Sequence, residues 1–226
     1  MDYTEGYMRI KELFDLDFTL ARRLFESGEY PWEVLDGLEE FIIRAGKRLP
    51  EEDFYKADRY VWIAKDARVD KSATVIGPTI IDRRAEVRCG AFIRGRVIIG
   101  KGCVVGNSSE VKGSVLFDGA QVPHYNYVGD SVLGHLAHLG AGAITSNLKS
   151  DGTEVTVRCG DEKIHTGRRK LGAAVGDGVE VGCSAVLMPG CVIGRGSRIY
   201  PLVRVRGTVG ENVIVKDENT IVGRIL

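Results

Sequence analysis

The sequence predicts an all-β solenoid, a parallel β-helix of six-residue repeats with an α-helical N-terminal cap. The first observation is a bulky apolar residue at every sixth position, at Ile63, Val69, Val75, Ile81, Val87, Ile93, Ile99, Val105, Val111 and Phe117. The second is the return of this spacing near the C-terminus, at Val175, Val181, Leu187, Ile193, Ile199 and Val205. A strand has a period of two residues and a helix a period of 3.6, so neither explains it. A fixed period of this length is typical of stacked coils.

Each six-residue unit is long enough for one short strand and one turn. Three units close a triangular coil of about eighteen residues, and successive coils stack at the strand spacing of about 4.8 Å. The repeated apolar residue then points inward onto its equivalents in the neighbouring coils, where Val and Ile suit short buried strands. The glycines that follow many of these positions suit turns that require positive φ.

Between the two runs the period fails. Three aliphatic-glycine pairs are spaced five and then six residues apart, at Val128-Gly129, Leu133-Gly134 and Leu139-Gly140. A dropped residue indicates a kink or bulge, and such irregularities often lie beside functional sites. Residues 147–170 have no apolar ladder and contain two turn signals, Asp151-Gly152 and Cys159-Gly160-Asp161. We therefore predict an inserted loop or hairpin there, on the binding face of the solenoid.

Residues 1–60 differ from the rest and are predicted to be helical, with the β-helix occupying residues 61–226. Their apolar residues have helical spacing in three groups: Ile10, Leu13 and Phe14; Leu20, Leu24 and Phe25; and Val34, Leu35, Leu38, Phe41 and Ile42. Pro31 suits the first turn of a helix. An open coil end exposes strand edges, so solenoids need caps, and a helical cap is our first interpretation. A segment that covers substrate or binds a partner is the alternative.

Composition excludes several classes of function. The 31 basic and 31 acidic residues balance, so no nucleic-acid partner is indicated. No apolar stretch approaches membrane-spanning length, and the acidic start Met1-Asp2-Tyr3-Thr4-Glu5 does not resemble a signal peptide. Five cysteines without a metal-binding spacing indicate free thiols in a reducing compartment, so we expect a cytoplasmic protein.

Two cations are placed together by the repeat. Arg94 and Lys112 each follow a ladder residue and are eighteen residues apart, so both point outward from adjacent strands. Like charges opposite each other on neighbouring strands are destabilising. We therefore expect an anion between or beside them, such as a sugar phosphate or nucleotide phosphate. The alternative is that both long side chains extend into water.

Histidines supply the second group of candidates. His124 lies where the period breaks, and a histidine takes up a proton near neutral pH, which suits the general base of an acyl transfer. A surface or structural role is the alternative, and Tyr127 either hydrogen-bonds a substrate or covers the coil. With His135 and His138 nearby we considered zinc. Gamma-class carbonic anhydrases share this fold, but their pair of histidines five apart is missing here, so we expect no metal.

The predicted insertion ends in a basic run, Arg168-Arg169-Lys170. A mobile basic loop of this kind suits the phosphates of coenzyme A. The alternative is a solvated run of charge, diluted by the acidic residues Asp151, Glu154, Asp161 and Glu162.

Three segments carry a resemblance to a known family: 106–112 (Gly-Asn-Ser-Ser-Glu-Val-Lys), 124–130 (His-Tyr-Asn-Tyr-Val-Gly-Asp) and 140–145 (Gly-Ala-Gly-Ala-Ile-Thr). Together, and in their spacing, they resemble the C-terminal acetyltransferase domain of bifunctional glucosamine-1-phosphate acetyltransferase/N-acetylglucosamine-1-phosphate uridyltransferase. The resemblance covers roughly residues 60–215. It is strongest to a shorter, archaeal-like branch of sugar-phosphate nucleotidyltransferase-like proteins, which has a similar extra hairpin between Ser146 and Lys170.

The resemblance implies left-handed coils, a homotrimer with shared sites, and acetyl-CoA as co-substrate. It also implies that Arg94 and Lys112 hold the acceptor phosphate, that His124 is the base and that Tyr127 contacts the acceptor. Ala141 matches an alanine beside acetyl-CoA, and backbone N–H groups from Gly140 to Gly142 are expected at the oxyanion. The implied activity is acetyl-CoA-dependent N-acyl transfer to an amino-sugar phosphate, similar to glucosamine 1-phosphate, or to a nucleotide sugar related to UDP-N-acetylglucosamine.

Three positions depart from the family pattern. His138 replaces an asparagine that contacts the acceptor, Cys183 replaces a serine near the CoA thiol, and Glu218 replaces an arginine that reaches the CoA tail. Residues 1–60 also lack a Gly-rich phosphate loop, so no nucleotidyltransferase activity is expected from this chain. The alternative function is a non-catalytic trimeric protein that binds a sugar phosphate or nucleotide sugar.

Overall fold

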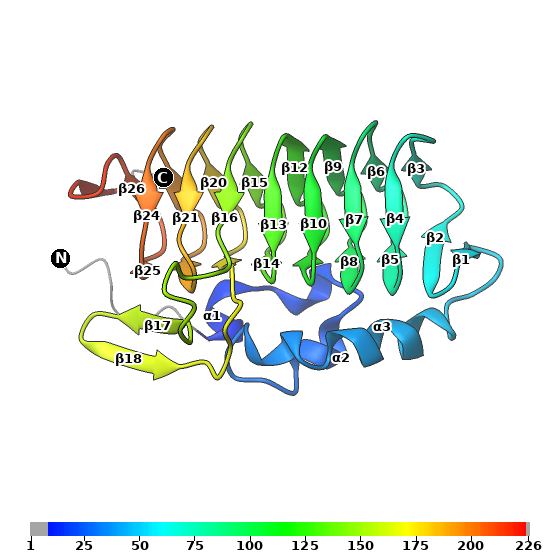
Figure 1. Ribbon diagram of the computed structural model, residues 1–226, viewed down its shortest axis with the longest axis horizontal. Helices are drawn as coiled ribbons and strands as arrows, with labels where there is room; N and C mark the ends of the chain where they lie inside the picture. The colour runs from blue at the N-terminus through cyan, green and yellow to red at the C-terminus, as the bar shows by residue number, and fades with distance from the viewer. Residues whose placement is uncertain (1–8, 225–226) are drawn as a thin grey trace.

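The computed structural model, which describes residues 9–224, contains a left-handed β-helix of triangular cross-section (Figure 1). Each coil passes through three parallel sheets in turn, which we name sheets A, B and C. The predicted solenoid of hexapeptide repeats is therefore confirmed. No helix in the described part of the chain is long and apolar enough to cross a bilayer.

Sheet A faces the helices, sheet C lies at the front of Figure 1, and sheet B lies behind. Sheet A contains β1 (Phe54–Asp58), β2 (Val61–Ala64), β5 (Thr79–Ile81), β8 (Val97–Ile99), β11 (Val115–Leu116), β14 (Val132–Leu133), β19 (Ala173–Val175), β22 (Cys191–Ile193) and β25 (Thr208–Val209). Sheet C contains β4 (Thr74–Ile76), β7 (Phe92–Arg94), β10 (Glu110–Lys112), β13 (Tyr127–Gly129), β16 (Ile144–Thr145), β21 (Val186–Leu187) and β24 (Arg204–Val205). Sheet B contains β3 (Arg68–Val69), β6 (Glu86–Val87), β9 (Val104–Asn107), β12 (Gln121–His124), β15 (His138–Leu139), β20 (Glu180–Val181), β23 (Arg198–Ile199), β26 (Val213–Val215) and β27 (Ile221–Gly223).

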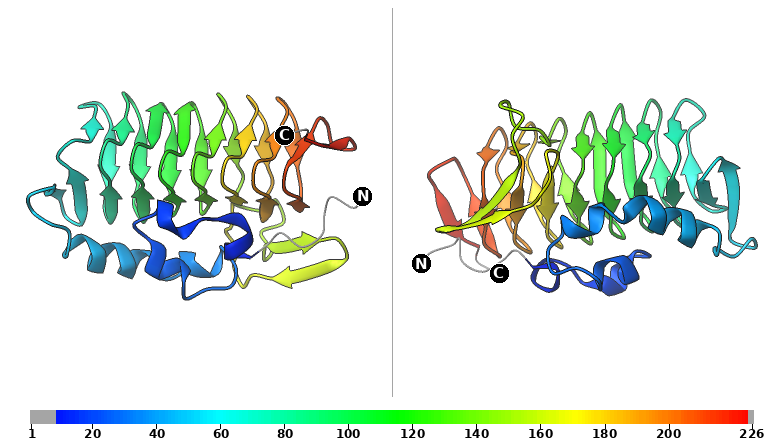
Figure 2. Two further views of the ribbon diagram at one scale, coloured as in Figure 1. Left: turned by 180° about the vertical axis from the view of Figure 1, so that it is seen from behind. Right: turned by 60° about the horizontal axis from the view of Figure 1, so that its bottom comes forward.

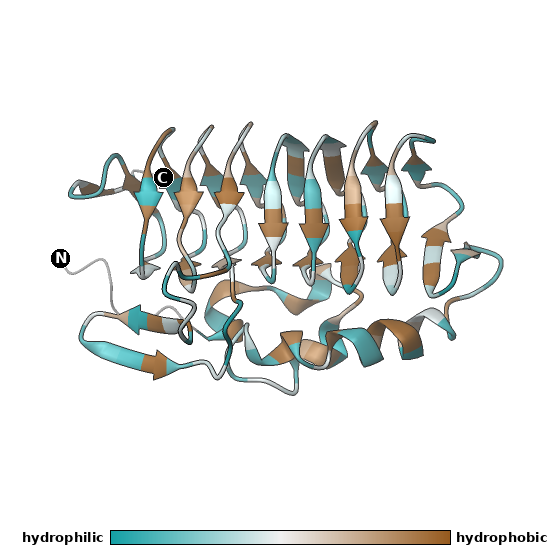
Figure 3. Cartoon of the chain, in the orientation of Figure 1, coloured by the Kyte–Doolittle hydropathy of each residue, from teal (hydrophilic) through white to brown (hydrophobic). Residues whose placement is uncertain are grey.

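The ladder residues fill the inside of the coil, with one exception. Val87, Ile93, Ile99, Val105 and Val111 are fully buried in one cluster, and the apolar middle residues of the sheet C strands are visible in Figure 3. Phe117 was predicted as the next member, but Leu116 pairs with Ile99 and takes the inner position. Phe117 points outward and contacts the rings of Phe14 and Phe25 at centroid distances of 5.1 and 5.0 Å.

Two five-residue steps therefore interrupt the ladder, from Val111 to Leu116 and from Val128 to Leu133. Both fall at the corner where sheet C passes into sheet A. Gly113 and Asp130 occupy this corner with φ of 55° and 48°. This is the left-handed conformation, which glycine and aspartate tolerate best. Arg96 adopts it at the same corner of the preceding coil, where the step is six residues.

The N-terminal segment packs along the side of the coil (Figures 1 and 2). It contains α1 (Ile10–Leu13), α2 (Arg22–Phe25) and α3 (Leu38–Gly46), with single 3₁₀ turns at Leu16–Phe18 and Glu33–Leu35. We predicted a cap over a coil end; the segment covers sheet A instead. The physical reason is that outward residues of sheet A are apolar and buried beneath the segment: Ile80, Ile98, Val115, Val132, Ala174 and Val192.

Antiparallel strands protect the two ends of the coil. At the start, β1 folds back on β2, with Tyr55 paired to Ile63. At the end, β27 folds back on β26, with Val222 paired to Ile214. Each return strand covers an edge that would otherwise offer unpaired backbone groups to another chain.

The insertion leaves the coil after β16 and returns at β19. It contains a two-stranded antiparallel hairpin, β17 (Thr156–Cys159) and β18 (Glu162–His165). Val155 and Val157 are buried in the same apolar cluster as the N-terminal segment, and the hairpin lies beside that segment in Figure 2. The five cysteines are all free thiols.

Trp62 of β2 is held against the end of α3 at Gly46. A Cβ atom at Gly46 would lie 2.3 Å from the Trp62 ring. We expect Gly46→Ala to lower the free energy of unfolding by about 1–3 kcal/mol, because the ring must shift in a packed interface. Urea denaturation measures this, and pairing the change with Trp62→Phe should recover part of the loss. Helix propensity alone predicts the opposite, a gain of up to about 1 kcal/mol.

The N-terminal segment is fastened to the coil at the corner between sheets A and B. The Asp177 carboxylate accepts hydrogen bonds from the backbone N–H groups of Asp15 and His135 at 2.7 and 2.8 Å, and Arg195 lies 3.7 Å away. Phe18 stacks on the His135 ring at 3.8 Å. Burial raises the pKa of Asp177 above its ordinary value of 3.8, against the effect of these donors and of Arg195.

The raised pKa of Asp177 predicts a pH dependence of stability. The folded chain holds this proton more tightly than the unfolded chain, so the carboxyl contributes stability that is gained as pH falls from its raised pKa toward 3.8. Asp177→Asn lacks this gain. In urea denaturation between about pH 3 and 7, the unfolding free energy of the wild type minus that of the variant should therefore grow as pH falls. A difference that does not vary with pH would contradict this assignment.

Candidate functional site

One edge of the prism, where sheet B turns into sheet C, brings together three residues predicted from the sequence. His124 ends β12, and the register that pairs Gln121 with His138 places Ala141 next to His124. The same register, with His138 paired to Glu180, places Cys183 beside Ala141. These edge residues, His124, Ala141 and Cys183, are thus one coil apart, so His124 and Cys183 are separated by about 10 Å along the axis.

Buried Asn126 fixes the backbone of this edge. Its Nδ2 donates to the carbonyls of Gly140 and Ala143 at 2.8 and 3.1 Å, and its Oδ1 accepts from the His124 N–H at 3.0 Å. The His124 ring is exposed and has no hydrogen-bond partner in residues 9–224. The ring is therefore positioned by its backbone and remains open to a bound molecule.

Of the three backbone N–H groups expected at the oxyanion, two already donate hydrogen bonds within the coil. Those of Gly140 and Gly142 donate to the carbonyls of Val181 and His124 at 2.7 and 2.9 Å. The Ala141 N–H forms no hydrogen bond within the described residues. Of the three, only Ala141 retains a backbone donor for a ligand at this edge.

Arg94 lies on the outer face of sheet C and turns toward this edge. Its guanidinium forms an ion pair with Glu110 at 2.6 Å and lies over the Phe92 ring at 5.6 Å. Phe92, Glu110 and Tyr127 occupy the strand positions next to the edge. The Arg94 side chain is 45% exposed, so the ion pair can exchange with a dissolved anion.

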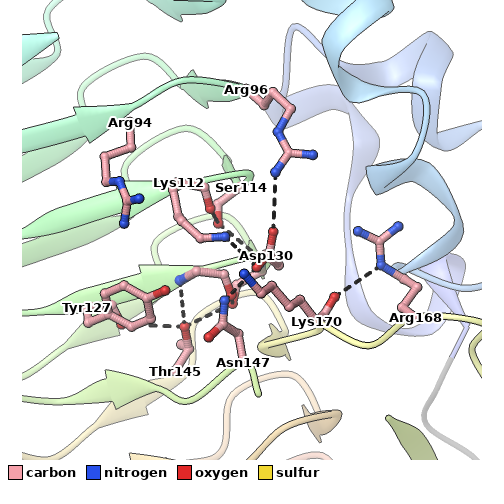
Figure 4. Close-up of polar contacts among 12 residues, drawn as sticks. Arg94, Arg96, Lys112, Ser114, Tyr127, Asp130, Thr145, Asn147, Arg168 and Lys170 are labelled. Atoms are coloured by element: carbon pink, nitrogen blue, oxygen red, sulfur yellow. Dashed lines mark hydrogen bonds and ion pairs between the residues drawn. The ribbon is translucent and has the colours of Figure 1, made fainter. Parts of the chain in front are cut away.

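Lys112 turns the opposite way, into a polar group at the corner between sheets C and A (Figure 4). We call this the corner cluster; it consists of Arg96, Lys112, Asp130, Asn147 and Lys170. The Asp130 Oδ2 accepts from Lys112 Nζ at 2.7 Å and from Asn147 Nδ2 at 2.5 Å, while Arg96 lies 3.7 Å from Oδ1. The Lys170 side chain extends toward the same carboxylate in Figure 4. The Asp130 side chain is only 4% exposed.

The five-residue step explains why the corner cluster forms. It puts Asp130 at the tight turn, beside Gly113 of the preceding coil. A Cβ atom at Gly113 would lie 2.6 Å from Asp130 Oδ1 and 3.4 Å from an Arg96 nitrogen. Gly113 therefore leaves the space in which the carboxylate and the guanidinium approach each other.

Polar residues replace the apolar ladder just where the insertion leaves the coil. Thr145 takes the inner position of β16 and is fully buried, and its hydroxyl accepts from the Gly129 N–H at 3.0 Å. The Ser131 hydroxyl lies 3.0 Å from the same oxygen and accepts from the Ala173 N–H at 3.0 Å. These bonds satisfy the backbone beneath the corner cluster.

Tyr127 links the face of sheet C to the corner cluster. Its ring is half-buried, and its hydroxyl interacts with the Asn147 side chain (Figure 4). Burial raises the pKa of the Tyr127 phenol, and the carboxylates of Asp130 and Glu110 act in the same direction. The phenol therefore keeps its proton at neutral pH and is available as a hydrogen-bond donor.

From the sequence we expected a bound anion between or beside the stacked cations Arg94 and Lys112. The anions beside Arg94 and Lys112 are the protein's own carboxylates, Glu110 and Asp130. Four cations, Arg94, Arg96, Lys112 and Lys170, nevertheless face two carboxylates, Glu110 and Asp130, which leaves a net charge of +2. This face of the coil therefore still favours a dianion.

The basic run at the end of the insertion does not form one patch. Arg168 is largely buried, where it forms an ion pair with Asp36 of the N-terminal segment and donates to the Lys170 carbonyl. Arg169 donates to the carbonyl of Gly152 at 3.1 Å. Lys170 alone turns to the corner cluster. The three residues therefore have three different environments.

The histidines lie apart from one another. His124 is at the edge between sheets B and C, His138 is within β15, and His135 is at the corner between sheets A and B. His165 lies in the hairpin, 3.5 Å from Glu154. Among residues 9–224, no three His, Cys, Asp or Glu side chains are grouped as metal ligands would be.

Sequence reasoning missed Asp130, Asn147, Arg96 and Asn126. One signal was present, because Asp130 lies eighteen residues after Lys112, close to one coil length. The strand register pairs Lys112 with Gly129, so Asp130 stands one residue further, at the corner. Asn147 could not be predicted because it belongs to the insertion, and only tertiary packing places it beside Asp130 at the corner. Arg96 was hidden because it occupies the corner with φ of 53°, outside any strand.

Comparison with known proteins defines the class. Residues 75–164 match the model of the GMPPB C-terminal domain, and residues 172–207 match that of the bacterial transferase hexapeptide (six repeats). With the observed coil, these matches identify the chain as a hexapeptide-repeat protein with a left-handed β-helix.

The more particular likeness is to bifunctional sugar-phosphate enzymes. The chain is 37% identical over 171 residues to the bifunctional sugar-1-phosphate nucleotidylyltransferase/acetyltransferase of Sulfurisphaera tokodaii, an alignment that covers 68% of this chain and 43% of that protein. It is 35% identical over 217 residues to the bifunctional protein GlmU of Methanococcus maripaludis, covering 88% and 49%. The predicted resemblance is therefore confirmed, and the chain spans about half the length of these relatives.

Solved structures of low sequence identity align with part of the chain. The UDP-N-acetylglucosamine O-acyltransferase of Moraxella catarrhalis aligns with a TM-score of 0.42 at 12% identity, covering 70% of this chain and 72% of that one.

Proposed function

We propose that the chain is an acetyl-CoA-dependent N-acyltransferase whose acceptor is an amino-sugar phosphate or a nucleotide sugar. One observation carries the proposal: an exposed histidine, His124, lies on an edge beside a face of net charge +2. The names of the relatives, which include acetyltransferase and sugar-1-phosphate chemistry, support the same class.

The acceptor phosphate is assigned to the outer face of sheet C. Arg94 exchanges Glu110 for the phosphate, since this ion pair is exposed. Lys112 and Lys170 supply positive charge from the corner cluster, and the Tyr127 hydroxyl donates to the acceptor. His138, which stands one coil from Gln121 on sheet B, faces the other side of the edge and is assigned to the sugar.

The chemical step is direct transfer. The acceptor amine attacks the thioester carbon of acetyl-CoA while His124 Nε2 or Nδ1 takes the proton from the amine. The tetrahedral oxyanion accepts a hydrogen bond from the Ala141 N–H, which has no other partner in the described chain. Collapse of this intermediate forms the amide and releases CoA as the thiolate, which takes up a proton.

The edge residues favour a site that a second copy of the chain completes. His124 is exposed, and Tyr125 and Leu202, in the next column of the same edge, are 65% and 81% exposed. A homotrimer would bury these side chains and would provide the second wall for acetyl-CoA beside Ala141 and Cys183. Gly142 turns the chain at the same place, with φ of 72°.

One assay tests the proposed function. The protein is incubated with acetyl-CoA and a panel of amino-sugar 1-phosphates and amino nucleotide sugars, and thiol release is followed with a chromogenic disulfide. We expect turnover with at least one acceptor, and the acetylated product by mass spectrometry. Absence of turnover across the panel, together with saturable binding of a sugar phosphate, would instead support the binding protein.

The second candidate function is a non-catalytic trimeric protein that binds a sugar phosphate or nucleotide sugar. Both predicted phosphate ligands already have carboxylate partners, Glu110 and Asp130. In addition, Glu218, which stands where the resembled family has an arginine, forms an ion pair with Arg204 at 2.8 Å. The cytoplasmic location stays a prediction from the free cysteines.

A further inference from the structure

A cavity lies at the N-terminal end of the coil, on the side of sheet A. Its volume is about 510 Å³, and it is walled by the end of α3, by strands β1 and β2, and by the segment that joins them. These elements meet at the right of Figure 1. The acyl-transfer site proposed above lies on sheet C and on the edge between sheets B and C, so no residue is shared between the two.

Aromatic rings form much of this cavity wall. Trp62 and Phe54 are buried at the back. The Tyr60 ring lies 6.3 Å from the Trp62 ring at 33° and is partly exposed, and Tyr55 is 48% exposed. Tyr60 is held at φ of 59°, at the turn between β1 and β2. The Arg59 guanidinium lies over the Tyr60 ring at 5.4 Å. Partly exposed aromatic rings in a concave site suit a planar ligand that stacks on them.

Three lysines reach the same cavity from three different elements. Lys47 follows α3, Lys56 belongs to β1, and Lys65 follows β2. None of them forms an ion pair within residues 9–224. Arg83, whose guanidinium lies over the Phe54 ring at 4.9 Å, does form one, with Asp53 at 2.7 Å.

The charges of this cavity favour an anionic ligand. Its lining contains the three lysines and one carboxylate, Glu51, which leaves a net charge of +2. The negative end of the α3 dipole accounts for Lys47 as a helix-stabilising residue. It does not account for Lys56, which belongs to β1, or for Lys65, which follows β2. Ammonium groups bind phosphate as compact point charges.

We propose that this cavity binds a nucleotide. The base stacks on Tyr60, and the phosphates lie among Lys47, Lys56 and Lys65. The aromatic wall selects for the nucleoside and the lysines for the phosphate, so neither half of the ligand alone satisfies the site. A volume of about 510 Å³ is within the range of small-molecule and cofactor sites.

Calorimetric titration with AMP, UMP and inorganic phosphate tests this proposal. We expect saturable binding of at least one nucleotide, and weaker binding of inorganic phosphate. The triple variant Lys47→Ala/Lys56→Ala/Lys65→Ala should weaken nucleotide binding by at least tenfold. Its matched control, Lys71→Ala/Lys163→Ala/Lys216→Ala, removes the same charge from exposed lysines outside the cavity and should bind like the wild type.

A pair of variants at Tyr60 separates stacking from charge. Tyr60→Phe should keep nucleotide affinity, whereas Tyr60→Leu should weaken nucleotide binding without changing that of inorganic phosphate. If the triple variant is destabilised, the single exposed change Lys56→Gln replaces it. The proposal is overturned if no nucleotide binds, if the lysine variants bind normally, or if Arg94→Ala/Lys112→Ala abolishes binding, which would place the nucleotide on sheet C.

Discussion

Replacing His124 by alanine is expected to lower kcat for acyl transfer by about 10²–10⁴-fold, the contribution typical of a general base. The imidazole is exposed and makes no hydrogen bond within the described chain, so its removal should leave the folded structure unchanged. The acceptor is held by other residues, Arg94 among them, so KM should change little. Steady-state kinetics with thiol detection measures both constants, and the unfolding midpoint checks the fold.

A matched control exists in His165, an exposed histidine of β18 in the inserted hairpin. His165→Ala should retain wild-type kcat, because this residue is neither on the edge nor on sheet C. Arg94→Ala should instead raise KM for the phosphorylated acceptor, since it removes a binding group. A His124→Ala enzyme with more than about a tenth of wild-type kcat would contradict the assignment of the base.

Replacing Asp130 by alanine is expected to lower the free energy of unfolding by about 3–5 kcal/mol, the usual cost of breaking a buried ion pair. Lys112 is only 13% exposed, so its ammonium group would be left without a partner. The variant also loses the hydrogen bond from Asn147 and places alanine at φ of 48°. Urea denaturation at neutral pH measures the change.

Two further variants separate the ion pair from the backbone. Asp130→Asn keeps a side-chain acceptor and a residue that tolerates positive φ, so its loss should be smaller. Combining it with Lys112→Met removes the unpaired charge, and the double variant should be more stable than Asp130→Ala. Glu110→Ala, which breaks an exposed pair, should change stability little. If Asp130→Ala unfolds at the wild-type midpoint, the corner cluster contributes no net stability.

The periodic part of the fold was predictable because it is local. Ile93, Ile99 and Val105 reveal the coil without any long-range information, since each six-residue unit repeats one strand and one turn. The orientation of Phe117, by contrast, is not set by the local repeat. Both Leu116 and Phe117 are bulky and apolar, and only the packing of Phe14 and Phe25 against sheet A decides which of them faces outward.

The candidate site was also predictable only in part. His124, Ala141 and Cys183 were found from the sequence, and the coil places them in one column because they occupy equivalent positions. Arg94 and Lys112 were also found, and they do lie on adjacent strands. Their partners were not, because the direction of a long side chain depends on carboxylates such as Glu110 and Asp130 that reach it from neighbouring coils.

By itself the sequence determined that this protein is a coil of stacked six-residue units, and it determined which residues line one edge of that coil. Its spacing is a physical consequence of short strands that must all bury one face. Only the tertiary structure decided that the helices cover sheet A, that Asp130 closes the corner with Lys112 and Asn147, and that Lys170 alone of the basic run turns to the corner cluster. Those outcomes depend on contacts between segments far apart in the chain, which no local pattern records.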